Sequence, residues 1–400
     1  MDSDDTPDGE EAYTVQAQPK YQHNLTLPVR LQWNANYGYC GSTSMVMAGM
    51  YYGAYMSQYD QRYMASNNTK QHLQVSQLLL GVNDYWSETT RGAAAERQQH
   101  MHEDSHSSTS DPTGDTPNSL EMLHSLIHPL YFPCVRCCCL CFRTAHQQKL
   151  TNELWNYGDL NVRHFLTWIK SQVLQDRVVI MGIYENGYIF DFKGGDEDYD
   201  HIVPVTGWGS SHPLTDLGYY DDDVIYFSDN GLYTPEAGGN GEEVSVYHIS
   251  ATMTEIGKTR TDANKRTAGV YSLNSAPTKA NPNFAISITG IVDEHNDCLP
   301  TSLTSDHNYE SPEIAENSDT RPTPMSQVIT ATARKLVVGK SYNMYMYSAF
   351  GNVPSTAFNA AAGQAAQTWS FTATADTWST TQTVRTDQSA IFRTVLTTAS

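Results

Sequence analysis

The run STSMVMAGMYYGAYMSQY at residues 42–59 contains no proline and places Met, Val, Ala, Tyr and Gly on nearly every side of a helix. A helix that is apolar all round has to be covered by other elements, so this run predicts a buried central helix. Ala48, Gly49 and Gly53 are small enough to let neighbouring elements approach closely. Because a helical Gly costs about 1 kcal/mol relative to Ala, we expect a packing reason for the glycines.

Length and composition predict two folded domains. The chain has 400 residues, of which 39% are hydrophobic, and one domain takes about 100–200 residues. Residues 1–20 are acidic and lack periodic apolar positions, which predicts a disordered tail. Ordered sequence begins near Tyr21, and a first domain is expected over 21–275. The Pro/Asn-rich run SAPTKANPN at 275–283 predicts a linker to a second domain at 283–400.

The first domain is predicted to be α+β, with the helix at 42–59 early and strands late. Residues 161–174 show a single apolar stripe, which predicts an amphipathic helix. The stripe consists of Val162, Phe165, Leu166, Ile169 and Val173. Short apolar runs at 177–184, 201–207 and 223–227 predict strands.

The second domain is predicted to be an all-β sandwich of about 120 residues. Its apolar side chains recur with a period of two, as in half-buried strands. The alternating sets are Phe284, Ile286 and Ile288; Tyr342, Met344 and Met346; and Trp369, Phe371 and Ala373.

Residues 91–148 interrupt the first domain without any helical or strand period. Two explanations stay open: a disordered insertion, or untranslated sequence kept by a faulty gene model. Five of the seven cysteines lie here, at Cys134, Cys137, Cys138, Cys139 and Cys141. Four thiolate ligands within eight residues leave poor room for tetrahedral zinc, so no metal or cofactor is expected.

The charge balance narrows the class of partner. Lys and Arg number 24 against 44 Asp and Glu, giving a formal net charge of −20. Such a chain repels phosphate backbones and anionic membranes, so nucleic acid is not an expected partner. No transmembrane span is expected, because His, Pro and Arg break the longest apolar stretch, near 120–142. The acidic N-terminal residues show no features of a signal peptide. Compartment and oligomeric state stay open.

Cys40 is the candidate nucleophile. Two cysteines, Cys40 and Cys298, stand alone in the ordered regions, which is no disulfide framework. Cys40 is followed by Gly41-Ser42 and begins the predicted central helix. The positive end of a helix dipole favours the thiolate, the reactive form of cysteine. The backbone N–H of Cys40 could also face an oxyanion.

His201 is the candidate base, because it begins an apolar strand that would hold its backbone still. A third group should orient the imidazole and stabilise its cation. Asp229 closes the next predicted strand, in the triplet Ser228-Asp229-Asn230, and an antiparallel neighbour would lie beside His201. Asn230 is the alternative, since its amide oxygen can accept the same hydrogen bond. Side-chain amides upstream of the cysteine, on Gln32, Asn34 and Asn36, are candidates for stabilising an oxyanion.

Three motifs together resemble the papain-like cysteine peptidases, especially the peptidase C39-like group. They are NANYGYCGSTS around Cys40, DHIVPVTGWG at 200–209, and the strand that ends in Ser228-Asp229-Asn230. The resemblance covers roughly residues 28–250 apart from the insertion. It implies that Cys40 attacks a carbonyl, that His201 transfers the proton and that Asp229 holds His201. The family usually has Gln six residues before the cysteine, where this chain has Asn34.

The sequence therefore predicts a papain-like domain followed by an all-β sandwich. The expected activity is cleavage of amide bonds through a thioester on Cys40, with a peptide or protein as substrate. The alternative is a catalytically inactive papain-like domain that binds peptides or glycans. The departure at Asn34 is the main support for this alternative.

Overall fold

A computed structural model describes the following residues of this chain: 12–13, 19–32, 39–65, 145, 147–185, 201–228, 230, 246–250, 255–256, 258–261, 267–269, 271–274, 276–279, 282–312, 321 and 323–397. Within them a few helices accompany many strands, and all strand pairs are antiparallel. This composition fits the predicted α+β class and also fits a mostly-β class. The helical segments are α1 (Cys40–Tyr51), α2 (Gln58–Ala65), α7 (Val162–Val173), η5 (Phe350–Asn352) and η6 (Ala362–Gln364).

A nine-stranded sheet forms the first unit, in the order β4-β13-β5-β6-β7-β8-β9, with β12 on β5 and β2 on β6. Its strands are β2 (Tyr21–Asn24), β4 (Leu150–Leu154), β5 (Val178–Glu185), β6 (His201–Ser210), β7 (Val224–Ser228), β8 (Val246–Ser250), β9 (Glu255–Ile256), β12 (Tyr271–Ser272) and β13 (Ala285–Ile291). A separate small sheet contains β1 (Ala12–Tyr13), β10 (Lys258–Thr261) and β11 (Thr267–Gly269). The strands predicted at 177–184, 201–207 and 223–227 are confirmed as β5, β6 and β7.

Helix α7 confirms the predicted amphipathic stripe. Phe165, Leu166, Ile169 and Val173 are buried in the core formed with β5 and β6. The helix begins after Asn161, whose side chain accepts hydrogen bonds from the backbone N–H groups of residues 163 and 164. Such a cap satisfies donors that the first turn leaves unpaired, which explains why the helix begins here.

Two sheets of the second unit face each other as a sandwich, in the orders β14-β20-β17-β18 and β15-β16-β19. Its strands are β14 (Cys298–Leu299), β15 (Thr301–Ser305), β16 (Ser326–Ala333), β17 (Ser341–Tyr347), β18 (Gln367–Thr372), β19 (Trp378–Arg385) and β20 (Ala390–Leu396). A shared core joins Leu303, Ile329 and Ala331 of one sheet to Tyr342 and Phe392 of the other. The predicted alternation of the 342–346 and 369–371 sets is therefore that of β17 and β18.

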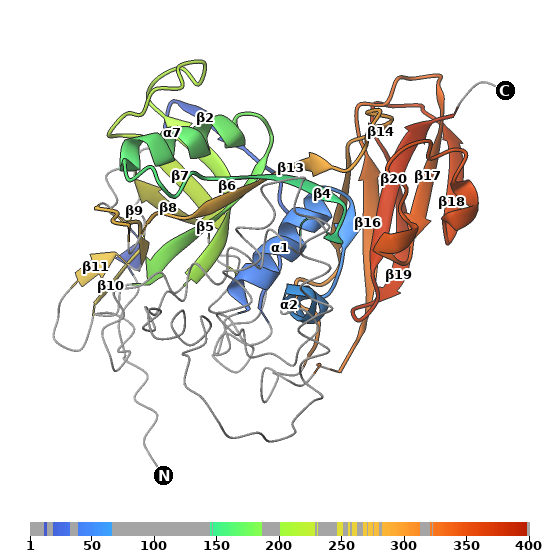
Figure 1. The fold of residues 1–400 in the computed structure, drawn as a ribbon, viewed down its shortest axis with the longest axis horizontal. Coiled ribbons are helices and arrows are strands. Elements are labelled where there is room, and N and C mark those ends of the chain that lie inside the picture. Colours follow the sequence, from blue (N-terminus) through green and yellow to red (C-terminus); the bar gives the residue numbers. More distant parts are fainter. Residues whose placement is uncertain are drawn as a thin grey trace, which may run out of the picture.

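Helix α1 lies between the two units (Figure 1), which explains its apolar surface on all sides. Ten of its residues are buried. Met45 and Ala48 pack into the core of the nine-stranded sheet, whereas Val46 and Met50 pack into the core of the sandwich. The prediction of a buried central helix is confirmed.

The helix is shorter than predicted, because the chain turns at Gly53. Gly53 has φ +75°, a left-handed conformation that ends helices and that other residues adopt at a cost. Beyond it, β3 (Ala54–Tyr55) pairs with β20 of the sandwich, and α2 begins at Gln58. A Cβ on Gly49 would lie 2.8 Å from the backbone O of Ala54, so this glycine does permit a close approach.

Two boundaries predicted from the sequence differ from the strand pairing in the structure. Strand β13 follows the predicted linker, yet it lies between β4 and β5 in the first unit. Its residues 285–288 are all buried, so it is a central strand covered on both faces rather than a half-exposed sandwich strand. Within the predicted disordered tail, Ala12 and Tyr13 pair with Thr259 and Lys258 of β10. Short pairings of this kind leave no periodic pattern in the sequence.

The predicted insertion at 91–148 lies outside the described residues, apart from 145, 147 and 148. In the part of the chain that is described, no helix is long and apolar enough to cross a membrane.

Candidate active site

Cys40 is the first residue of α1, as the flanking sequence predicts. The preceding residue, Tyr39, contributes no side-chain hydrogen bond to the helix end, and the first turn contains no acidic residue. The first intrahelical bond runs from Thr43 N to Tyr39 O, at 2.8 Å. No acid in the first turn therefore neutralises the positive end of the helix dipole beside Cys40. The Cys40 residue is 3% exposed.

The first turns of α1 lie against the beginning of β6. The Ser44 hydroxyl donates a hydrogen bond to the backbone O of Ile202, at 3.0 Å. Ile202 follows His201 directly, and the backbone of His201 is held by pairing with Ile183 of β5. The backbone of the predicted base is thus placed beside the helix of the predicted nucleophile. The side chain of His201 lies outside the described part of the structure.

Asn230 joins α1 and β6 just after the end of β7. Its Nδ2 donates to Cys40 O at 3.0 Å, to Ser44 Oγ at 2.7 Å and to Ile202 O at 3.3 Å. Two of these acceptors are backbone carbonyls, so the atom that faces them has to be the nitrogen, and the orientation of the amide is fixed. Asn230 is fully buried, and its Oδ1 has no hydrogen-bond partner in the structure described here.

Gln32 lies next to Asn230. The backbone N of Gln32 donates to the backbone O of Asn230 at 2.8 Å, and the carbonyl of Leu31 accepts from the Gln58 side chain at 3.1 Å. Gln32 is 6% exposed, and its Oε1 is buried without a hydrogen-bond partner among the described residues. An uncompensated buried amide oxygen is unfavourable, which marks the Gln32 Oε1 as an atom that a hydrogen-bond donor could satisfy.

The remaining predicted residues lie outside the described part of the chain. These are Asn34, Asn36, Asp229 and the cysteines between Cys134 and Cys141. Among the described segments, no group of three His, Cys, Asp or Glu side chains is arranged to hold a metal ion.

Ser44 is a residue of this site that the sequence-based interpretation missed. It stands four residues after Cys40, and residues at this spacing share one face of a helix. Ser44 is fully buried, and its hydroxyl is hydrogen-bonded to Ile202 at the beginning of β6 and to Asn230 just after β7. The helical spacing from Cys40 was the signal that could have identified it.

No protein-family model, no curated protein and no solved structure matches this chain. The resemblance to papain-like peptidases therefore rests on the three sequence motifs alone.

Proposed function

We propose that this chain is a cysteine hydrolase of papain-like architecture that cleaves amide bonds in peptides. The observation that carries the proposal is the contact of Asn230 with both the carbonyl of Cys40 and the carbonyl of Ile202. This contact joins three places that are far apart in the sequence: the helix start at Cys40, the strand start at His201 and the segment after β7. Those are the three places where the motifs put nucleophile, base and orienting group.

The chemistry follows from the roles of these groups. The Cys40 thiolate attacks the carbonyl carbon of the amide, and one electron pair of the C=O bond moves to oxygen. Collapse of this intermediate breaks the C–N bond, and the leaving amine takes a proton from the His201 imidazolium. The product is a thioester on Cys40. His201 then takes a proton from water, the hydroxide attacks the thioester, and the acid and the thiolate are released.

Gln32 is the better candidate for stabilising the oxyanion, with the backbone N–H of Cys40. Its backbone bond to Asn230 brings it to the same end of α1 as Cys40. Amide donors that point to the developing charge lower the barrier by about 3 kcal/mol each in related sites. Asn34, at the position where the family has its Gln, is the alternative.

Asn230 is the better candidate for the group that orients His201. Its Nδ2 is committed to α1 and β6, so its Oδ1 is left to accept a hydrogen bond from another donor. A neutral amide oxygen can hold an imidazole in one orientation as a carboxylate does. Asp229, the first choice from the sequence, stays the alternative.

A second candidate is a papain-like domain without activity that binds peptides or glycans. The exposure of Cys40, only 3%, favours it, because a nucleophile has to be reached by its substrate. The departure from the family at Asn34 favours it as well.

Alkylation of the full chain with iodoacetamide and with the epoxide E-64, followed by mass spectrometry between pH 5 and pH 9, separates the two. Cys298 serves as an internal control, because its burial raises the pKa of its thiol well above the usual range. We expect Cys40 to be labelled at pH 6 and Cys298 not, and His201→Ala to slow labelling of Cys40 by about 100-fold or more. Cys40→Ala should abolish hydrolysis of a fluorogenic peptide amide. A Cys40 that reacts as slowly as Cys298 would favour the binding domain.

A further inference from the structure

The hydroxyl of Ser44 has both of its usual hydrogen-bonding roles filled by the candidate site. It donates to Ile202 O at 3.0 Å and accepts from Asn230 Nδ2 at 2.7 Å. Ser44 is fully buried, so water does not compete for either bond. One side chain thus connects α1 to the beginning of β6 and to the segment after β7.

Ser44 and Asn230 form one closed set of hydrogen bonds with the backbone. Asn230 also holds Cys40 O at 3.0 Å, while Ile202 O accepts from both Ser44 and Asn230. Of the two bonds at Ile202 O, the one from Ser44 is shorter, 3.0 Å against 3.3 Å. Without the hydroxyl, the backbone O of Ile202 would lose the shorter of these two side-chain bonds and keep the longer one from Asn230.

We propose that Ser44 is a positioning residue, which sets the separation between the Cys40 thiol and the His201 imidazole. This inference rests on the proposed function, because it assigns Ser44 to the same thiolate–imidazole pair. The physical reason is that Ser44 and its acceptor are close along the chain to the two reacting groups. Ser44 lies one helical turn from Cys40, and its acceptor is one peptide from His201. Displacements of about 1 Å in such a pair cost about 100-fold in rate.

Thr43 provides a matched control on the same helix turn. It is also fully buried, and its hydroxyl also makes one side-chain hydrogen bond, to Gln58 Oε1 at 3.0 Å. That bond points to α2 and not to the strands. Thr43→Val therefore removes a buried hydroxyl from α1 without touching the bonds to β6 and Asn230.

The test compares the full chain with Ser44→Ala, Ser44→Thr and Thr43→Val, measuring the rate of Cys40 alkylation by iodoacetamide from pH 5 to pH 9. Thermal unfolding by circular dichroism shows that each variant is folded at the assay temperature. We expect Ser44→Ala to react at least 10-fold more slowly at pH 6, with a pH profile that moves towards that of an ordinary thiol. Ser44→Thr, which retains the hydroxyl, should restore most of the rate, and Thr43→Val should keep the original profile.

The outcomes separate this inference from the proposed function. If the unchanged protein already reacts as an ordinary thiol, both are overturned. If the unchanged protein is activated and Ser44→Ala has the same pH profile, only the role of Ser44 is overturned. Failure of Ser44→Ala to fold, while Thr43→Val folds, would give the hydroxyl a purely structural role and overturn the inference as well.

Discussion

The side-chain amide of Asn230 is buried and only partly hydrogen-bonded. Its Nδ2 donates to the backbone O of Cys40, whereas its Oδ1 has no hydrogen-bond partner in the described part of the chain. The sequence could place both Asp229 and Asn230 near the base, but it could not choose between them. Adjacent residues at a strand end point in different directions, and a shift of one residue exchanges their roles. The choice depends on the contacts of Nδ2 with Cys40 O and Ile202 O, which are long-range and leave no mark in the local sequence.

Separate substitutions of Asn230 and Asp229 distinguish the roles of these two residues. Under the proposed roles, we expect Asn230→Ala to slow alkylation of Cys40 at pH 6 by at least 10-fold, because the imidazole would lose its acceptor and α1 would lose its connection through Asn230 to Ile202 of β6. Asp229→Ala should change the rate by less than about threefold if Asn230 is the group that orients His201, as proposed. Rates measured on both variants with the same reagent provide the comparison. The reverse order of effects would assign the orienting role to Asp229.

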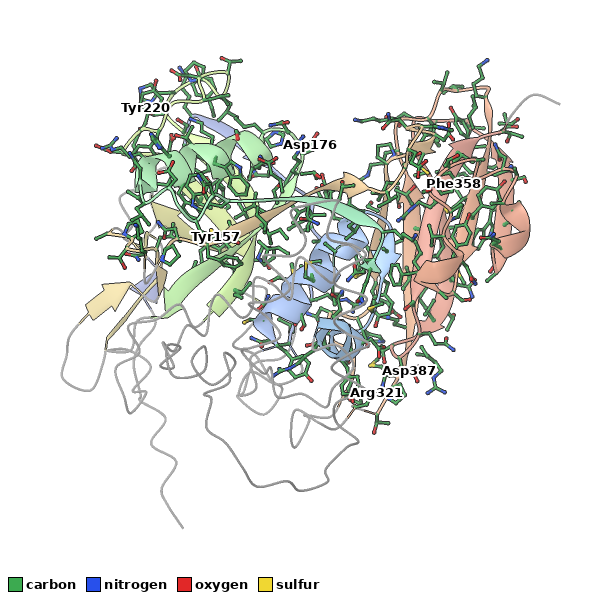
Figure 2. All side chains as sticks on the ribbon, in the orientation of Figure 1. Tyr157, Asp176, Tyr220, Arg321, Phe358 and Asp387 are labelled. Carbon is green, nitrogen blue, oxygen red and sulfur yellow. The ribbon has the colours of Figure 1, made fainter. Side chains whose placement is uncertain are left out.

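Glu310 is a buried acid at the seam between α2 and the sandwich. Its Oε2 accepts a hydrogen bond from the backbone N of Gln58 at 2.9 Å, which helps to cap α2. A small pocket beside it is lined by Arg321 and Asp387 among others, both labelled in Figure 2. Burial raises the pKa of the Glu310 carboxyl to about 7, although the nearby Arg30 charge opposes this shift.

This shift predicts a pH-dependent stability. The folded pKa lies above the unfolded one, so the contribution of Glu310 is complete below about pH 4.5 and is lost as the pH rises through about 7. At 1.4 kcal/mol for each pKa unit, the loss is about 3 kcal/mol. Urea unfolding at several pH values should show this loss in the unchanged protein and not in Glu310→Gln. Glu294→Gln, at an exposed glutamate, is the control. Parallel pH curves for the unchanged protein and Glu310→Gln would contradict the assignment.

At the scale of elements, the sequence predicted whether a segment is a helix or a strand better than it predicted where the segment ends or which strand it pairs with. Helix α7 and strands β5, β6 and β7 follow from local periodicity, because each buries one clear set of side chains. The end of α1 depends on the φ of Gly53, and a glycine within an apolar run does not by itself predict a turn. The partner of β13 was not predictable either, since Phe284, Ile286 and Ile288 alternate equally well for a strand of either sheet.

Gly49 tests the close packing of α1. A Cβ there would lie 2.7 Å from Gln148 Oε1 and 2.8 Å from Ala54 O, and the backbone O cannot move aside easily. We expect Gly49→Ala to lower the free energy of unfolding by about 2 kcal/mol, despite the better helix propensity of Ala. Gly351→Ala, where a Cβ meets nothing within 4 Å, is the control and should leave stability unchanged or slightly higher. Equal stability of the two variants in urea would show that the neighbours of Gly49 relax.

At the scale of the whole molecule, the two units share their central helix. Val46 and Met50 belong to the core of the sandwich, although they lie on the helix that begins with Cys40. Two buried arginines add to this connection. Arg393 Nη1 donates to Tyr52 O at 3.1 Å, just after α1, and Arg30 donates to His307 O and to Gln327 Oε1, both at 2.7 Å. The sequence predicted two domains, but it could not show that they are joined through a common core.

Removal of the sandwich should therefore disturb the candidate site. A chain that ends at residue 291 retains β13 but exposes Val46, Met50 and Tyr55 and leaves β3 without its partner. Each large apolar side chain returned to water costs about 2 kcal/mol, against total stabilities of about 5–15 kcal/mol. We expect this shortened chain to bind a hydrophobic dye and to lack a sharp thermal transition, in contrast to the full chain. A cooperative transition with a native near-ultraviolet spectrum would show that the first unit folds alone.

The pairing of β3 with β20 also has a consequence during protein synthesis. Ala54 and Tyr55 leave the ribosome early, whereas their partners Ile391 and Ala390 are translated more than three hundred residues later. The strand that follows the Cys40 helix therefore lacks its partner strand until β20 has been synthesised. In a nascent chain, the helix that begins with Cys40 therefore lacks the pairing of β3 with β20 until translation has passed residue 391.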